Sequence, residues 1–123
     1  MKKLCALRGA CRCRNEEDDI ILQIAALYDA LLGQNRLKED DIVSLLFSVT
    51  ADIDALNPAA ALRRSGRAGN LALFTQQEAA FKDSLDRTIR VLIHCYMEED
   101  ALLRHVYQNG AEVLRPDRVN RVQ

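Results

Sequence analysis

Residues 88–93 read Thr-Ile-Arg-Val-Leu-Ile, and this stretch predicts a buried strand within a longer strand expected over 87–96. Its residues are mostly β-branched or aliphatic and follow the period of two that strands show. Arg90 is the exception, because a guanidinium keeps its proton and burying it unpaired costs several kcal/mol. The sequence therefore predicts an anion beside Arg90. That anion is either a carboxylate of this chain, such as Glu78, or a carboxylate or oxyanion of a ligand.

Outward from this strand, the pattern predicts three more strands and a C-terminal hairpin. The strands lie at 3–10, 42–49 and 71–75. The apolar run 42–49 is expected to be covered on both faces. A short acidic helix is expected near 98–103. The hairpin then pairs 104–107 with 111–115 around Asn109-Gly110, a favoured hairpin turn.

Two further helices are predicted from their start and stop signals. The longer one follows Asn15 as N-cap, carries acidic residues in its first turn, and stops at Gly33. Its apolar stripe consists of Ile20, Ile24, Leu27 and Leu31. The shorter one covers 58–65, because Asn57-Pro58 is a cap followed by the first helical position that proline favours, and Gly66 ends it.

This order of elements indicates a mixed α/β fold in which one long helix and short helices pack on a sheet of five or six strands. The 123 residues fit a single domain over 1–117, followed by a flexible tail over 118–123. Such a small sheet leaves edges and apolar faces, which favours oligomerisation.

Composition excludes several classes of partner. The formal net charge is −1, with 17 cations against 18 anions, so no electrostatic case exists for nucleic acid or an anionic membrane. Thirteen of the cations are Arg, whose planar guanidinium forms bidentate hydrogen bonds with carboxylates and phosphates. The first residues resemble an export signal, but Arg8 interrupts the apolar run, and no stretch reaches membrane-spanning length. We expect a cytoplasmic protein.

The four cysteines form no Cys-x-x-Cys pair and match no zinc spacing. Cys11 and Cys13 face the same side if their segment is a strand, and with His94 or His105 they could hold a metal. Reduced cytosolic thiols are the favoured interpretation. We therefore expect no metal.

Polar residues that look out of place fall at strand ends: Arg8, Glu78, Arg90, Tyr107 and Arg115. A purely structural explanation exists, since Glu78 could simply neutralise Arg90. The chain has no Ser-His-Asp order, no glycine-rich phosphate loop and no His-x-x-x-His. An active site at these positions would hold anions without a nucleophile, a metal or a phosphate-binding loop.

Several segments, in order along nearly the whole chain, resemble the monofunctional chorismate mutases of the AroH class. They are Leu7-Arg8-Gly9-Ala10, Thr75-Gln76-Gln77-Glu78, Ile89-Arg90-Val91, His105-Val106-Tyr107 and Leu114-Arg115-Pro116-Asp117. The resemblance implies a trimer of α/β subunits arranged as a pseudo-barrel, with active sites at the clefts between subunits. It also implies the Claisen rearrangement of chorismate to prephenate, in aromatic amino acid biosynthesis and without a cofactor.

The resemblance further implies a role for each site residue. Arg90 would stabilise charge on the ether oxygen, Glu78 would accept from the ring hydroxyl, and Arg8 would bind the enolpyruvyl carboxylate beside a hydrogen bond from Tyr107. These three charged residues would be catalytic. The remaining substrate-binding positions are Phe74 and Thr75 through their backbone, Gln76, Gln77, and Arg63 and Arg115 near the cleft entrance.

Three positions depart from the family pattern. Asn57 stands where the family commonly has Phe, Ala60 where it has Lys, and Thr75 where it has Cys. Arg64 could replace the missing cation at position 60. The alternatives are thus a chorismate mutase, a non-catalytic anion-binding trimer of the same fold, and a structural oligomer in which Arg90 pairs only with Glu78.

Overall fold

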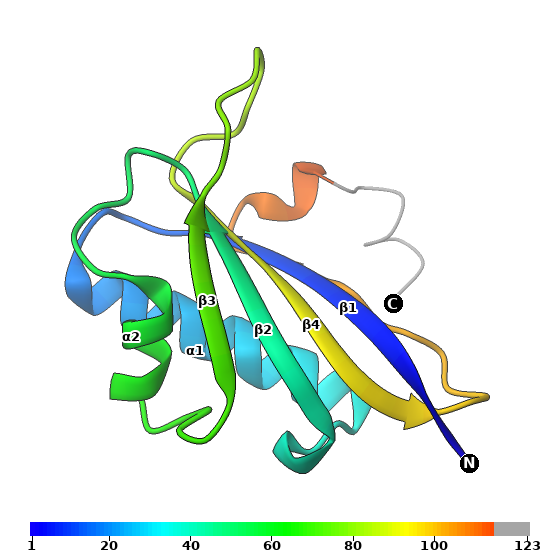
Figure 1. The fold of residues 1–123 in the computed structure, drawn as a ribbon. Coiled ribbons are helices and arrows are strands. Elements are labelled where there is room, and N and C mark those ends of the chain that lie inside the picture. Colours follow the sequence, from blue (N-terminus) through cyan, green and yellow to red (C-terminus); the bar gives the residue numbers. More distant parts are fainter. Residues whose placement is uncertain (115–123) are drawn as a thin grey trace.

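The computed structural model describes residues 1–114, which form a five-stranded sheet with the order β3-β2-β4-β1-β5 (Figure 1). The central strand β4 runs antiparallel to β2 and β1, whereas β3 pairs with β2, and β5 with β1, in parallel. The mixed sheet of five or six strands is confirmed. The strands are β1 (Lys2–Arg12), β2 (Ile42–Val49), β3 (Ala72–Gln77), β4 (Thr88–Glu98) and β5 (Val106–Gln108).

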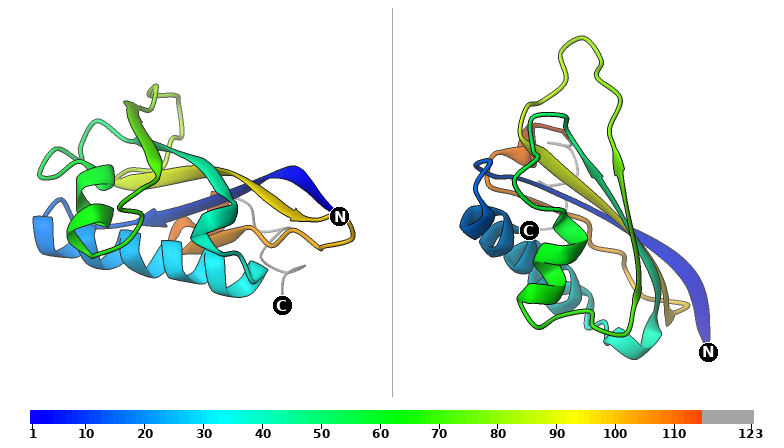
Figure 2. Two further views of the ribbon diagram at one scale, coloured as in Figure 1. Left: turned by 60° about the horizontal axis from the view of Figure 1, so that its bottom comes forward. Right: turned by 60° about the vertical axis from the view of Figure 1, so that its left-hand side comes forward.

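Both α-helices, α1 (Glu17–Asn35) and α2 (Pro58–Arg64), lie on one face of the sheet (Figure 2). The predicted stripe of α1 is buried, and Asn57 caps α2 by accepting the Ala59 N–H at 2.9 Å. Two short 3₁₀ helices, Glu39–Asp41 and Ala111–Leu114, complete the described elements. Among residues 1–114, no helix combines the length and apolarity needed to cross a membrane.

The sheet has a helix-covered face and an open face. Along β4, Ile89, Val91 and Ile93 are buried under the helices, whereas Arg90 and Leu92 point the other way. The prediction that Arg90 is buried is therefore wrong for the single chain, in which 44% of its side chain is exposed. The strand itself is confirmed. Period two buries every second residue only, because both α-helices cover the same face.

Gly9 allows α1 and β5 to approach β1 closely. A Cβ at this position would lie 2.9 Å from Leu31 Cδ1 of α1 and 3.1 Å from the carbonyl oxygen of Val106 in β5. Gly9 therefore sets the distance at which α1 and β5 pack against β1, the strand that carries Arg8.

The ends of α1 differ from the prediction. The N-cap is Glu16, because the side-chain oxygen of Asn15 instead accepts the N–H groups of Asp54 and Ala55. Gly33 does not stop the helix, which continues to Asn35. The chain leaves it through Arg36 in the left-handed conformation, with φ of 51°.

The C-terminal region was predicted wrongly in two places. Residues 99–100 form a turn where a short helix was expected over 98–103. The hairpin is also wrong, because β5 pairs with β1 and residues 111–114 form a 3₁₀ helix. The side-chain amide of Asn35 binds both the N–H and the carbonyl of Arg104, each at 2.9 Å, and so holds the chain beside α1. Long-range contacts thus override the local turn signal.

Candidate active site

One row of paired residues crosses the open face and joins all five strands. Arg90 in β4 pairs with Ser48 in β2 and Ala10 in β1. Ser48 then pairs with Gln76 in β3, and Ala10 with Tyr107 in β5. Because paired residues point to the same side of a sheet, this register gathers Gln76, Arg90 and Tyr107 from segments far apart in the sequence.

A cavity of about 300 Å³ lies over this row. Its polar lining includes Arg8, Ser48, Gln76, Arg90 and Tyr107, and Leu46 and Leu92 contribute apolar walls. Arg8, Leu92 and Leu46 form the neighbouring row of the sheet. The cavity therefore combines cations, hydrogen-bond donors and apolar walls, a common composition for a small-molecule site.

Glu78 reaches the cavity from the end of β3. Its Oε1 lies 2.8 Å from Nε of Arg90 and accepts a hydrogen bond from Ser48 Oγ at 3.2 Å. Its backbone N–H donates to the carbonyl of Val49 at 2.7 Å. The pair that a purely structural explanation requires is thus present, but it engages only Nε. Within residues 1–114, the terminal nitrogens of Arg90 have no described polar partner.

Two more polar groups of the cavity have no described partner within residues 1–114: the guanidinium of Arg8 and the hydroxyl of Tyr107. Only the backbone N–H of Arg8 is engaged, donating to Nδ1 of His105 at 2.9 Å. His105 lies just before β5, and its Nδ1 accepts this bond from the edge of β1. Two guanidinium groups face one carboxylate, so the cavity carries an excess positive charge that suits an anionic ligand.

Other residues predicted for the site lie outside this cavity. Phe74 shares the open face but is 60% exposed, and Gln77 and Arg63 are exposed elsewhere. Thr75 points to the helix side, where its hydroxyl donates to Asn57 Oδ1 at 2.8 Å. Two of the departures from the family pattern therefore contact each other. Arg115 lies outside the described residues.

Sequence reasoning missed Ser48, which holds Glu78 and lines the cavity. The signal was the alternation of Ser44, Leu46 and Ser48 along β2, which marks one strand face as more polar than the other. The prediction that both faces of the strand 42–49 are covered left this difference between the faces unused. Arg64 does not replace the cation missing at position 60, because it pairs with Glu17 of α1 at 3.1 Å.

The cysteines do not meet the histidines. Cys11 and Cys13 are buried on the helix side, whereas His94 lies on the open face beside Ser44. No group of three or more His, Cys, Asp or Glu side chains is placed to hold a metal within residues 1–114. Burial raises the pKa of Cys11 to about 12 and that of Cys13 to about 11. These thiols stay protonated at neutral pH and are poor ligands or nucleophiles.

A second cavity, of about 310 Å³, lies at the end of the sheet beside the start of α1. It contains three arginines, each near a carboxylate. Arg12 and Arg87 contact Asp86, and Arg14 lies 3.5 Å from Glu16 and 3.9 Å from Asp19. Its positive charge is therefore matched within the chain.

Comparisons with known proteins agree on one family. Residues 4–118 match the family model of chorismate mutase type I. The chain is 32% identical over 114 residues to chorismate mutase AroH of Bacillus subtilis (strain 168), covering 90% of this chain and 89% of that protein. It is 31% identical over 115 residues to chorismate mutase AroH of Thermus thermophilus, covering 90% of this chain and 93% of that protein.

A solved structure agrees with these matches in its fold as well as its sequence. Chorismate mutase from Clostridium thermocellum has a TM-score of 0.82 and 39% identity, and the match covers 89% of this chain and 98% of that one. The family model covers most of the chain, and these relatives share both its sequence and its fold, so the chain belongs to the type I chorismate mutase family.

Proposed function

We propose that this chain rearranges chorismate to prephenate in the cavity lined by Arg8, Arg90 and Tyr107. The observation that carries the proposal is the set of unmatched donors on the open face. Arg8, Tyr107 and the terminal nitrogens of Arg90 point to one cavity without described partners in residues 1–114, and Glu78 lies beside them.

The reaction explains why such a site needs no nucleophile. A carbon–oxygen bond breaks as a carbon–carbon bond forms within one molecule. The enzyme therefore has to fold a flexible dianion into a chair-like conformer and stabilise the charge that separates in the transition state. Negative charge grows on the ether oxygen, and a fixed cation stabilises it without having to reorganise.

The described geometry supports a division of roles. Arg90 donates from its terminal nitrogens to the ether oxygen, while Glu78 holds its Nε. Glu78 accepts from the ring hydroxyl and balances positive character on the ring. Arg8 and Tyr107 bind the enolpyruvyl carboxylate, since neither the guanidinium nor the hydroxyl has a described partner within residues 1–114. Ser48 keeps Glu78 in place through its hydroxyl.

The active assembly in this proposal is a homotrimer with sites between subunits. Large apolar side chains are exposed on the open face, including Leu4 at 59% and Tyr96 at 45%, and exposed apolar patches mark interaction surfaces. Phe74, Thr75, Gln77 and Arg63 would then complete the cavity of a neighbouring subunit. Sedimentation of the purified protein tests this: a monomer at working concentration contradicts it.

Several finer expectations remain part of the proposal. They are a single domain over 1–117, a flexible tail over 118–123, and a place for Arg115 near the cleft entrance, all of which involve residues outside the described range. The four unpaired cysteines suit a reducing compartment, so we place the enzyme in the cytoplasm.

One observation favours the alternative of a non-catalytic anion-binding trimer. The Thr75 hydroxyl is already engaged by Asn57, so it is not presented to a ligand. Adding chorismate to the purified protein and following its ultraviolet absorbance separates the two functions. Loss of chorismate well above the uncatalysed rate is expected. Binding of a dicarboxylate analogue without such acceleration would establish the alternative.

A further inference from the structure

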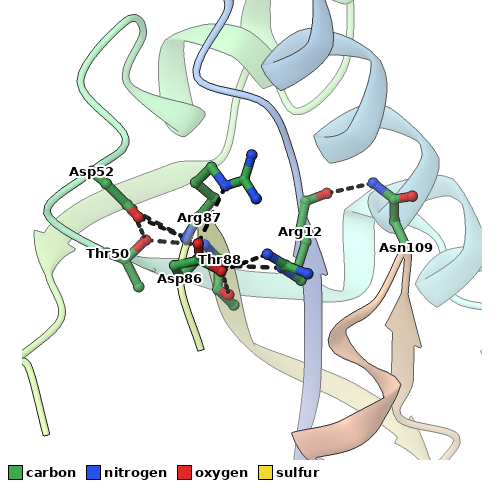
Figure 3. A network of polar contacts seen from close by, with 7 residues as sticks. All are labelled: Arg12, Thr50, Asp52, Asp86, Arg87, Thr88 and Asn109. Carbon is green, nitrogen blue, oxygen red and sulfur yellow. Dashed lines mark hydrogen bonds and ion pairs between the residues drawn. The ribbon is translucent and has the colours of Figure 1, made fainter. Parts of the chain in front are cut away.

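We propose that Asp52, Arg12 and Asp86 are positioning residues that fix Arg90 and Tyr107 through one polar network (Figure 3). This inference rests on the catalytic roles proposed above. The network lies at the end of the sheet, outside the cavity itself. It joins the loop after β2, the start of β4, the end of β1 and the turn after β5.

Asp52 fixes the first residues of β4. Its two carboxylate oxygens accept the backbone N–H of Arg87 at 3.1 and 3.0 Å, and its Oδ1 accepts the hydroxyl of Thr50. Thr50 in turn bonds Thr88 twice: Oγ1 accepts the Thr88 N–H at 3.0 Å, and the Thr50 N–H donates to the Thr88 carbonyl at 3.1 Å. Arg90 is only two residues further along the same strand.

Arg87 has a backbone conformation that needs such support. Its φ is 45°, in the left-handed region that non-glycine residues rarely adopt. Its N–H is held by Asp52 and its carbonyl accepts the Cys13 N–H at 3.0 Å. Strained residues of this kind persist where their surroundings determine them from both sides, and they cluster at functional sites.

Arg12 and Asp86 connect β4 to the strand that carries Tyr107. Arg12 donates from Nη2 and Nε to the Asp86 side chain and carbonyl, and the same carbonyl accepts the Thr88 hydroxyl at 2.9 Å. The Arg12 carbonyl accepts Asn109 Nδ2 at 2.7 Å, in the turn directly after β5. The network thus links the strands of Arg90 and Tyr107 through β1.

Because the network is exposed, its effect on the position of the catalytic groups can be distinguished from its effect on folding stability. The Asp86 side chain is 60% exposed, and exposed ion pairs such as its pair with Arg12 contribute little to folding. Asp52 is also exposed, and it accepts hydrogen bonds from one backbone N–H and one hydroxyl. A small displacement of a catalytic group can nevertheless reduce turnover strongly. Removing Asp52 should therefore lower kcat strongly and lower the melting temperature only slightly.

The test compares Asp52→Ala with Asp54→Ala. Asp54 lies in the same loop and carries the same charge, but its carboxylate contacts only Asn15, at 2.8 Å, among the partners described in residues 1–114. We expect Asp52→Ala to lower kcat by about 10- to 100-fold with a smaller change in KM, and Asp54→Ala to leave both within about twofold. Equal kcat in the two variants would overturn the inference.

A double variant shows whether Asp52 acts through Arg90. In an Arg90→Lys background, Asp52→Ala should lower kcat by less than about threefold, because the positioned group is already lost. Fully multiplicative losses would contradict positioning and indicate a general structural effect. If Arg90→Lys alone leaves kcat unchanged, the proposed catalytic roles fail. If Arg90→Lys lowers kcat and Asp52→Ala does not, only the network inference fails.

Discussion

Two cavities of nearly equal size contain arginines, and they differ in how those arginines are paired. The cavity at the end of the sheet, of about 310 Å³, holds Arg12, Arg14 and Arg87, each beside a carboxylate. In the open-face cavity, of about 300 Å³, Arg8 has no described side-chain partner in residues 1–114 and Arg90 uses only Nε. Charge that the chain leaves unmatched indicates a ligand, whereas the number of arginines does not.

The largest effect should come from Arg90→Lys. The substitution keeps the charge, but an ammonium cannot pair with Glu78 and donate to the ether oxygen in guanidinium geometry. We expect kcat to fall about 100- to 1,000-fold, as for loss of one oxyanion donor. Arg14→Lys in the other cavity is the matched control and should change kcat less than about twofold. Comparable losses in both variants would remove the distinction between the cavities.

Arg8→Ala should have the next largest effect. Removing one charged hydrogen bond to a substrate carboxylate costs about 1.5–3 kcal/mol, or about 10- to 150-fold in kcat/KM. Steady-state kinetics with chorismate measures it, with Arg14→Ala as control. An unchanged kcat/KM would mean that Arg8 does not contact the substrate.

Gly9→Ala tests how closely α1 and β5 must approach β1, the strand that carries Arg8. The added methyl group would meet Leu31 and the Val106 carbonyl, so we expect the free energy of unfolding to fall by about 1–3 kcal/mol. At Gly33 a Cβ meets nothing within 4 Å. Gly33→Ala inside α1 should therefore raise the free energy of unfolding by about 0.5–1 kcal/mol. Urea unfolding of both variants checks the pair. Equal effects would show that Gly9 is not sterically required.

The smallest effect on activity should come from Cys13, which lines the arginine cavity at the end of the sheet. Burial raises the pKa of its thiol to about 11, against a usual value of about 9. The native state therefore holds its proton where the unfolded chain has lost it, so this thiol's contribution to stability is present below pH about 9 and is lost as pH rises to about 11.

Alkylation followed by mass spectrometry measures the same shift. Labelling of Cys13 should be slow at pH 7 and rise about tenfold per pH unit up to pH 10, because only the thiolate reacts. Chorismate turnover at pH 7 should be unaffected by brief treatment with the reagent or by a metal chelator. Rapid labelling at pH 7 would contradict the raised pKa, and metal-dependent turnover would contradict a reaction without metal.

The elements that were predicted correctly are those with local signals. Asn57-Pro58 determined the start of α2 through one side-chain hydrogen bond, and β2 has the predicted bounds. The stripe of α1 was readable from its spacing. Its ends were not, because Asn15 has distant partners in Asp54 and Ala55 and the chain turns at Arg36 instead of Gly33.

The parts that failed depend on pairing between distant segments. Nothing near Asn109-Gly110 shows that β5 pairs with β1 and not with the following residues. The one-sided burial of β4, which exposes Arg90, follows from where α1 and α2 pack. The alternation along β2 marked Ser48 as lying on its more polar face, but only the register places Ser48 beside Arg90. The site's residue types were predictable, whereas their shared row across the sheet required the fold.

A crystal structure with a dicarboxylate transition-state analogue tests the central claim most directly, because it shows which unmatched charges meet a ligand. The account predicts one carboxylate at Arg8 and Tyr107, and the ether oxygen within hydrogen-bond distance of the terminal nitrogens of Arg90. An analogue bound among Arg12, Arg14 and Arg87, with Arg90 still contacting only Glu78, would contradict it.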